Sequence, residues 1–326
     1  SRTIIMIFIF KCKICYSLAM KNRFKVIDIY PRGFCKGVYN AIELAKKTRL
    51  EHPQEKISIL GELVHNKEVV LALAELGIQT VETKSRRRMD LLDEIDQGLV
   101  IFSAHGISPE VIDKAVSKGL TPINASCEDV LVTQNQIKAY LEQGYEVLYV
   151  GQKGHPEAES VLDLDPKRIK LVEVGKALPE VQTEHLFVTN QTTMSILDIR
   201  QTLDQVKSEY PFAIISDEIC SATRLRQEAV LKLPESVDGL IVIGDKSSNN
   251  TRMLVKIGEN KQISVILPIQ NLRELDPSRL EPCHEVAITA GASTPKYIID
   301  EVVHFVKVYS SDINAKKEDY KINPFL

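Results

Sequence analysis

The sequence predicts an α/β protein with mainly parallel sheets, built from three similar units. Short apolar, β-branched runs are followed by polar loops that contain glycine, and then by residues with helical periodicity. Strand–loop–helix alternation of this kind is typical of parallel sheets covered by helices. Three cysteines recur at nearly equal spacing, because Cys127 lies 92 residues after Cys35 and Cys220 lies 93 residues after Cys127.

The elements can be followed in order along the chain. Helix starts are marked by Ser108 and Thr294, each followed by proline, and by Ser195, which has Asp198 three residues later as in a capping box. The predicted strands lie at 24–29, 100–102, 147–150, 240–243 and 286–289.

We expect the working protein to begin near Met20. Residues 1–19 contain an apolar run that is too short for a transmembrane helix. We interpret them as an extension, which is either disordered or the result of a mis-assigned start. The pair Cys12 and Cys15 has no second pair nearby, which argues against a metal site there. The predicted α/β domains are 20–118, 119–212 and 213–326, the last with a C-terminal tail.

Composition argues against several classes of function. The chain has 326 residues and a net charge of −3, which favours neither a nucleic-acid partner nor a membrane surface. The basic run 84–88 reads as a solvated loop. Six scattered cysteines in a chain of this length are not a disulfide framework, so we expect a reducing, cytoplasmic location.

Cys35, Cys127 and Cys220 each follow a predicted strand and precede a predicted helix. Helix N-termini favour thiolates and an anionic cluster. Three cysteines would leave one iron of a [4Fe–4S] cluster open, whereas four would saturate it. Spacing alone favours this interpretation no more than the alternative, in which the three are unrelated buried cysteines. Cys283 lacks such a loop and reads as structural.

Two further loops follow each cysteine, again at the ends of predicted strands, where open α/β sheets bind ligands. Their imidazole and neutral donors suit an anionic, phosphate-bearing ligand, and Glu157 is the carboxylic acid among them that could deliver a proton. Taken singly, each histidine is more often an ordinary loop or core residue. The loops hold His65 and Asn66, then His105, then His155 and Glu157, then Gln191, Thr192 and Thr193, then Ser248, Asn249 and Asn250, and finally Ser293.

These residues lie in motifs that resemble the 4-hydroxy-3-methylbut-2-enyl diphosphate reductase family, which catalyses the last step of the methylerythritol phosphate pathway. The resemblance covers about residues 24–310 in the family's order. The motifs include 31–38 around Cys35, 63–66, 102–106, 154–157, 188–195, 218–223 around Cys220, 226–230, 248–251 and 289–293.

The resemblance implies a trefoil of three α/β domains around a central [4Fe–4S] cluster with one open iron. It implies a two-electron, two-proton reductive dehydroxylation of 4-hydroxy-3-methylbut-2-enyl diphosphate to isopentenyl and dimethylallyl diphosphate. Ferredoxin or flavodoxin would donate the electrons. By position, Cys35, Cys127 and Cys220 would be the cluster ligands. Glu157 would supply the proton and Thr192 would act near the substrate hydroxyl, while His65, His105, His155, Gln191, Thr193, Ser248, Asn249, Asn250 and Ser293 would bind the substrate.

The sequence departs from the family pattern after the second cysteine. Glu128 stands where proline is usual, and Val132 and Gln134 stand where lysine and histidine are expected. Loss of two basic groups would weaken docking of a redox partner or alter the cluster potential. Asn249 replaces a serine found in many relatives.

Two other functions remain open from the sequence. A non-redox cluster dehydratase also needs an open iron but turns over without an electron donor. A cluster-based sensor or electron carrier has no use for Glu157.

Overall fold

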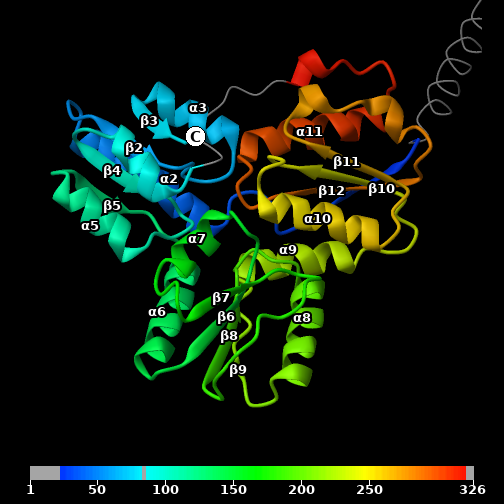
Figure 1. The fold of residues 1–326 in the computed structure, drawn as a ribbon. Helices are drawn as coiled ribbons and strands as arrows, with labels where there is room; N and C mark the ends of the chain where they lie inside the picture. The colour runs from blue at the N-terminus through cyan, green and yellow to red at the C-terminus, as the bar shows by residue number, and fades with distance from the viewer. Residues whose placement is uncertain (1–22, 83–85, 321–326) are drawn as a thin grey trace, which may run out of the picture.

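The computed structural model describes residues 23–82 and 86–320. The predicted extension 1–19, with Cys12 and Cys15, lies outside these residues, as do Lys84, Ser85 and the end of the tail. The described chain forms three α/β lobes around a common centre, which confirms the predicted fold class (Figure 1).

Three parallel sheets of four strands form the lobes, and all three have the same strand order. If the strands are counted from the cysteine that begins each lobe, the second strand lies at the edge, next to the first, which neighbours the third and then the fourth; in the third lobe β1 takes the fourth place. The orders are β3-β2-β4-β5 in the first sheet, β7-β6-β8-β9 in the second and β11-β10-β12-β1 in the third.

The first lobe carries the elements that follow Cys35. They are α2 (Lys36–Glu51), β2 (Ile57–Leu60), α3 (Lys67–Glu75), β3 (Ile78–Val81), α4 (Arg88–Leu91), η1 (Leu92–Glu94), β4 (Leu99–Phe102), α5 (Pro109–Ser117) and β5 (Thr121–Asn124).

The second lobe carries the elements that follow Cys127. They are α6 (Glu128–Glu142), β6 (Glu146–Val150), α7 (Pro156–Leu162), β7 (Ile169–Val172), β8 (Leu186–Asn190), α8 (Ile196–Glu209) and β9 (Ile214–Ile215).

The third lobe combines both ends of the described chain. Its elements are β1 (Lys25–Asp28), α9 (Ser221–Leu231), β10 (Gly239–Ile243), α10 (Asn249–Asn260), β11 (Val265–Ile269), η2 (Leu272–Glu274), η3 (Pro277–Leu280), β12 (Glu285–Ala290), α11 (Lys296–Tyr309) and η4 (Lys317–Tyr320).

Strand pairing does not follow the predicted divisions of the chain. β5 belongs to the first sheet although it lies after residue 118, and β9 belongs to the second although it lies after residue 212. β1 pairs with β12 and so completes the third sheet from the other end of the chain. Each sheet therefore takes its fourth strand from the segment just before the next cysteine. For the third sheet this strand is β1, which precedes Cys35.

The apolar runs of the sequence become strands because both faces of each sheet are covered. In the first sheet, Ile59 and Ile101 pack into the core on one face, while Leu60, Val100 and Phe102 pack into a second core on the other. Strands buried on both faces read as continuous apolar runs rather than as alternating ones. The predicted strands are confirmed within about one residue at each end.

Helix starts agree with the sequence, with one shift. Ser195 is the N-cap of α8 and accepts a hydrogen bond from the Asp198 backbone, and Ser108 precedes Pro109 at the start of α5. The N-cap of α11 is Pro295, one residue later than predicted.

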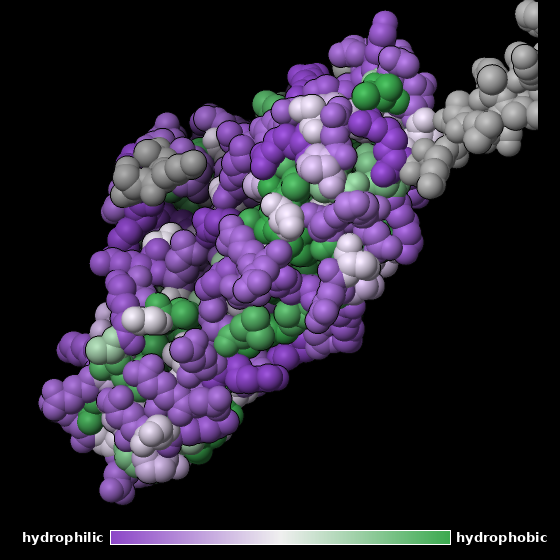
Figure 2. All heavy atoms as spheres, turned by 90° about the vertical axis from the view of Figure 1, so that its right-hand side faces the viewer, coloured by the Kyte–Doolittle hydropathy of each residue, from purple (hydrophilic) through white to green (hydrophobic). Residues whose placement is uncertain are grey.

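The surface of the described part of the chain is mainly polar. Figure 2 shows hydrophobic residues as separate patches among hydrophilic ones. Between residues 23 and 320, apart from 83–85, no helix has the length and apolar character needed to cross a bilayer.

Candidate active site

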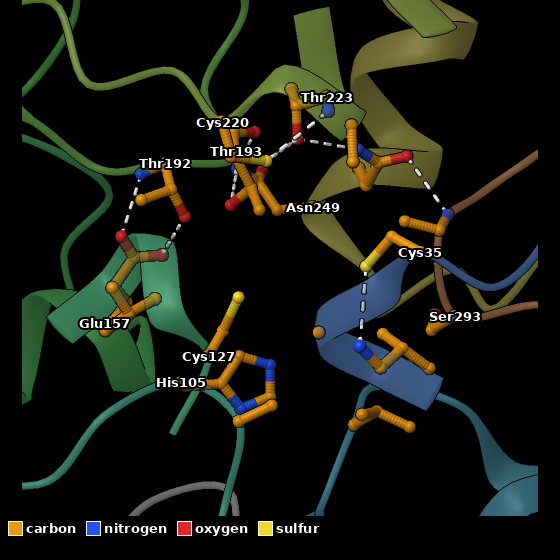
Figure 3. A pocket seen from close by; sticks show the side chains of 18 of the residues that line it. Cys35, His105, Cys127, Glu157, Thr192, Thr193, Cys220, Thr223, Asn249 and Ser293 are labelled. Atoms are coloured by element: carbon orange, nitrogen blue, oxygen red, sulfur yellow. Dashed lines mark hydrogen bonds between the residues drawn. The ribbon is translucent and has the colours of Figure 1, made fainter. Parts of the chain in front are cut away.

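One cavity lies at the centre, where loops of all three lobes meet. Figure 3 shows the sulfur atoms of Cys35, Cys127 and Cys220 on its walls, with Glu157 to one side. All the predicted site residues except Gln191 line it. They are Cys35, His65, His105, Cys127, His155, Glu157, Thr192, Thr193, Cys220, Ser248, Asn249, Asn250 and Ser293.

The three cysteines occupy equivalent positions, as their spacing suggested. Cys35, Cys127 and Cys220 are the N-caps of α2, α6 and α9. Each cysteine N–H donates to a carbonyl in the loop that follows the third strand of the preceding lobe. The pairs are Cys35 with Ala292 at 3.1 Å, Cys127 with Ala104 at 3.0 Å, and Cys220 with Thr192 at 3.1 Å. The first loop of each lobe also ends in a helix cap: Asn66, His155 and Ser248 are the N-caps of α3, α7 and α10.

Burial acts on the thiols more strongly than the helix termini do. It raises the pKa of Cys127 to about 11, and it raises the pKa of Cys220 as well. The free thiols of Cys127 and Cys220 are therefore protonated at neutral pH, and binding a metal centre there would release protons.

The cysteine helices approach each other closely at Gly37. A Cβ atom at this position would lie 2.5 Å from the Cys127 Sγ and 3.9 Å from the Cys35 Sγ, so a larger residue would displace the thiols. Among the described residues, no three His, Cys, Asp or Glu side chains are grouped closely enough to hold a single metal ion.

Glu157 is a buried carboxyl group held in one orientation. The Thr192 N–H donates to its Oε1 at 2.8 Å, the Thr192 hydroxyl donates to its Oε2 at 3.0 Å, and the Tyr149 hydroxyl donates to Oε1 at 3.3 Å. Burial raises the pKa of Glu157 to about 7, although the bonds from Thr192 and Tyr149 act in the opposite direction. The group can therefore hold and give up a proton near neutral pH.

His65, His105 and His155 form a cluster beside the thiols. Their ring centroids lie 4.2 Å apart for His65 and His105, 5.5 Å for His65 and His155, and 5.7 Å for His105 and His155. Burial first, and then the neighbouring cations and rings, lower the pKa values of His105 and His155 well below the usual range. The Nδ1 of His155 accepts the Glu157 N–H at 3.1 Å, which leaves the proton of the neutral ring on Nε2.

Several predicted substrate-binding side chains hold loops together. The Asn250 amide donates to the Thr223 hydroxyl at 3.0 Å and accepts the Ala292 N–H at 3.2 Å. The Ser293 hydroxyl donates to the His65 carbonyl at 2.9 Å. The Ser293 contact joins the third lobe to the first, whereas those of Asn250 hold two loops of the third lobe together.

Asn249 and Gln191 fix the loop of Thr193. The Asn249 amide donates to the Thr193 carbonyl at 2.8 Å, a reach that a serine at this position lacks. Gln191 does not line the cavity, because its amide accepts the Gln152 N–H at 3.0 Å and donates to the Thr193 hydroxyl at 3.1 Å.

The departures after Cys127 differ in their surroundings. Gln134 is buried and donates to the Ser160 hydroxyl at 3.0 Å, so it is not a surface group. Glu128 is exposed and pairs with Lys36 at 2.8 Å, and Val132 is 49% exposed one turn further along α6.

A second depression reaches the cysteines from the opposite, outer side. Cys35, Cys127 and Cys220 line it together with the first turns of α2, α6 and α9. The thiols therefore separate an inner cavity from an outer opening.

Sequence reasoning missed several residues of the site. Tyr149 reads as an ordinary apolar strand residue, and Thr223 reads only as a helix-start residue beside Cys220. The prediction of a solvated loop at 84–88 is wrong for Arg88, which is 6% exposed and pairs with Glu159. The strand pattern could have indicated Tyr149, because its hydroxyl needs a partner when it is buried.

The fold and the cavity define a class of α/β trefoil proteins with three thiols and a buried carboxyl group at one centre. A sequence model of the LytB protein family matches residues 26–307, and the chain belongs to this family.

Named relatives agree with this assignment. The chain is 42% identical to the 4-hydroxy-3-methylbut-2-enyl diphosphate reductase of Geobacillus sp. (strain WCH70), over 91% of this chain and 95% of that protein. It is 43% identical to the protein of that name from Bacillus subtilis (strain 168), over 88% and 92%. Among solved structures, the E-1-hydroxy-2-methyl-but-2-enyl-4-diphosphate reductase of Plasmodium falciparum matches with a TM-score of 0.80 at 28% identity, covering 93% of this chain and 92% of that one.

Proposed function

We propose that the chain is a 4-hydroxy-3-methylbut-2-enyl diphosphate reductase that yields isopentenyl and dimethylallyl diphosphate. The observation that carries the proposal is the placement of Glu157, a carboxylic acid with a pKa near neutrality, in the same cavity as three equivalent thiols. Membership of the LytB family supports the same activity.

Cys35, Cys127 and Cys220 would hold a [4Fe–4S] cluster with one open iron. The thiols come from three separate helix N-termini, line one cavity and are free, and soft sulfur donors suit iron–sulfur centres. When bound, this cluster would pass on, one at a time, the two electrons that an external donor supplies.

Glu157 would supply a proton to the hydroxyl group that leaves the substrate. Two electrons and two protons enter, the carbon–oxygen bond breaks, water leaves, and a carbon–hydrogen bond forms. Thr192 and Tyr149 hold the carboxyl group toward the cavity in their hydrogen bonds. A buried, oriented acid of suitable pKa contributes about 10²–10⁴-fold to such a step.

The histidine side of the cavity would bind the diphosphate. His155 offers its Nε2–H, and Ser248, Asn250 and Ser293 line the same cavity as the imidazoles. Helix N-termini such as those of α3 and α10 also favour an anion.

Ferredoxin or flavodoxin would deliver electrons through the outer depression. The same three cysteines line it, so a donor docked there lies close to the cluster without blocking the substrate side. The free cysteines of the described chain fit a reducing, cytoplasmic compartment.

Anaerobic assays with dithionite-reduced viologen test the proposal. The cluster-loaded protein should convert the hydroxy diphosphate to both products. Glu157→Gln should lower turnover at least about 100-fold while iron content and visible absorption stay unchanged. Glu184→Gln, which alters an exposed carboxylate before β8, is the matched control and should keep full activity.

Two outcomes would contradict the proposal. Turnover that continues without any electron donor would indicate a dehydratase. No product from a fully loaded wild-type sample would indicate a sensor or an electron carrier.

A further inference from the structure

We propose that Arg88 is a positioning residue for the diphosphate side of the pocket: its buried guanidinium offsets part of the negative charge of three carboxylates, which would otherwise repel the substrate more strongly. The inference rests on the proposed function, because it concerns the binding of a diphosphate beside the histidines.

Arg88 lies inside the protein although it ends a run of exposed basic residues. Its side chain is 7% exposed, and its Nη1 donates to Glu159 Oε2 at 3.3 Å. The Arg88 N–H donates to Glu159 Oε1 at 2.9 Å. The Glu159 carboxylate therefore accepts hydrogen bonds from both the backbone and the side chain of Arg88.

Gly61 makes room for this ion pair. A Cβ atom there would lie 2.9 Å from Arg88 Nη2 and 3.2 Å from Glu82 Oε2, so a larger residue would push into the guanidinium. Gly61 has a φ of +78°, which also favours glycine.

Three carboxylates surround the guanidinium. Glu159, Glu82 and Glu62 all act on the charge of Arg88, in that order of strength. Glu62 also bonds His65 Nδ1 at 3.0 Å, and the Glu62 N–H donates to Glu82 Oε2 at 3.3 Å. The acidic group thus lies directly behind an imidazole of the cavity.

The charge of Arg88 reaches the cavity as well. It lowers the pKa values of both His105 and His155, after the larger effects of burial and the neighbouring rings. Glu159 lies on α7, whose N-cap is His155 and whose first turn holds Glu157. One cation therefore acts on two of the three histidines and on the helix that carries the proton donor.

Charge balance explains why a cation is needed at this depth. A diphosphate carries several negative charges, and charges a few ångströms apart in a poorly solvated site interact strongly. Without Arg88, the carboxylates of Glu62, Glu82 and Glu159 would act on the ligand uncompensated. Because Arg88 donates its hydrogen bonds to Glu159, it acts on the ligand through its electrostatic field and by holding α7 in place.

Pyrophosphate binding to the cluster-loaded protein, together with steady-state kinetics, tests the role. Arg88→Met should weaken pyrophosphate binding and raise KM by about tenfold, which corresponds to about 1.4 kcal/mol, with kcat changed less than about threefold. Arg86→Met removes the same charge from an exposed residue of the same run, which pairs with Glu94 and not with the three carboxylates, and should leave both values unchanged.

Variants of Glu159 separate a charge effect from a folding defect. Glu159→Gln should tighten pyrophosphate binding several-fold, because it leaves Arg88 less neutralised, and the double variant Arg88→Met/Glu159→Gln should recover most of the lost affinity. Arg88→Met that binds pyrophosphate like the wild type, or Glu159→Gln that weakens binding, would overturn the proposal. If Arg88→Met does not fold, the Glu159→Gln variant alone tests the proposal: tighter pyrophosphate binding supports it and weaker binding contradicts it. A wild-type protein that neither binds pyrophosphate nor turns over would instead count against the proposed function.

Discussion

Single side chains gain their roles in this protein from partners distant in sequence. Glu157 bonds Thr192, which lies 35 residues away, and Arg88 pairs with Glu159, which lies 71 residues away. Glu157 could be predicted from its loop and its motif. The burial of Arg88 could not, because a run of basic residues favours solvent unless a distant carboxylate receives one of them.

Thr192 should set the pH range in which Glu157 keeps its proton. Its hydroxyl stabilises the carboxylate and so lowers the pKa of Glu157 from the still higher value that burial alone would give. Thr192→Val removes that bond and should raise the pKa by about one unit, since a hydrogen bond to a charged group contributes about 1.5–3 kcal/mol. Because the acid form is the active one, turnover should persist to higher pH.

The pH profile of kcat with viologen as donor measures this shift. Thr192→Ser keeps the hydroxyl and should retain the wild-type profile. A profile for Thr192→Val that moves to lower pH would contradict the assignment of Glu157 as the acid.

At the scale of elements, the same strand–cysteine–helix unit recurs three times. The apolar runs predicted the strands because sheets covered on both faces leave no polar alternation. The caps followed from local residue types. The strands before Cys127 and Cys220 were predicted as well, but the local pattern did not show which sheet they join, because β5 and β9 pair across the predicted divisions.

Cysteine at an N-cap can be replaced without loss of the helix. Serine is a good N-cap, and the Cys127 side chain makes no capping hydrogen bond, so Cys127→Ser should leave the far-UV circular dichroism unchanged. The variant should lose most of its iron and its visible absorption if Cys127 is a ligand. Cys283→Ser changes a buried cysteine of the third core and should keep its full iron content. Equal iron content in both variants would remove Cys127 from the ligand set.

On the scale of the whole molecule, the three lobes place substrate groups and the outer depression on opposite sides of the thiols. The trefoil arrangement followed from the family resemblance, whereas the outer depression was beyond sequence reasoning, because it depends on how the first turns of α2, α6 and α9 meet. The exposed Lys36–Glu128 pair across it contributes little to stability, as exposed pairs usually do.

A charge beside the outer depression should slow a protein donor but not a small reductant. Val132 lies one turn along α6 from Glu128, which lines the depression. Val132→Glu should slow reduction by ferredoxin or flavodoxin several-fold, because an interface desolvates the new carboxylate. Stopped-flow bleaching of the visible absorption measures the rate. Dithionite should reduce the variant at the wild-type rate, and the matched change Val116→Glu on α5 should affect neither reaction. An equal loss of rate with dithionite would place the effect elsewhere.

The position of β1 delays completion of the centre until late in the synthesis of the chain. β1 pairs with β12, so the strand that leads to Cys35 has no partner until residues 285–290 have been synthesised. The Cys35 N–H also donates to the Ala292 carbonyl, and the Arg226 side chain donates to the Gly33 carbonyl at 2.7 Å. The loop before α2 is therefore held by residues that are synthesised much later than the loop itself. A chain that stalls before Ala292 therefore lacks the contacts that hold the first cysteine, and the three thiols can be brought together only after most of the protein has been made.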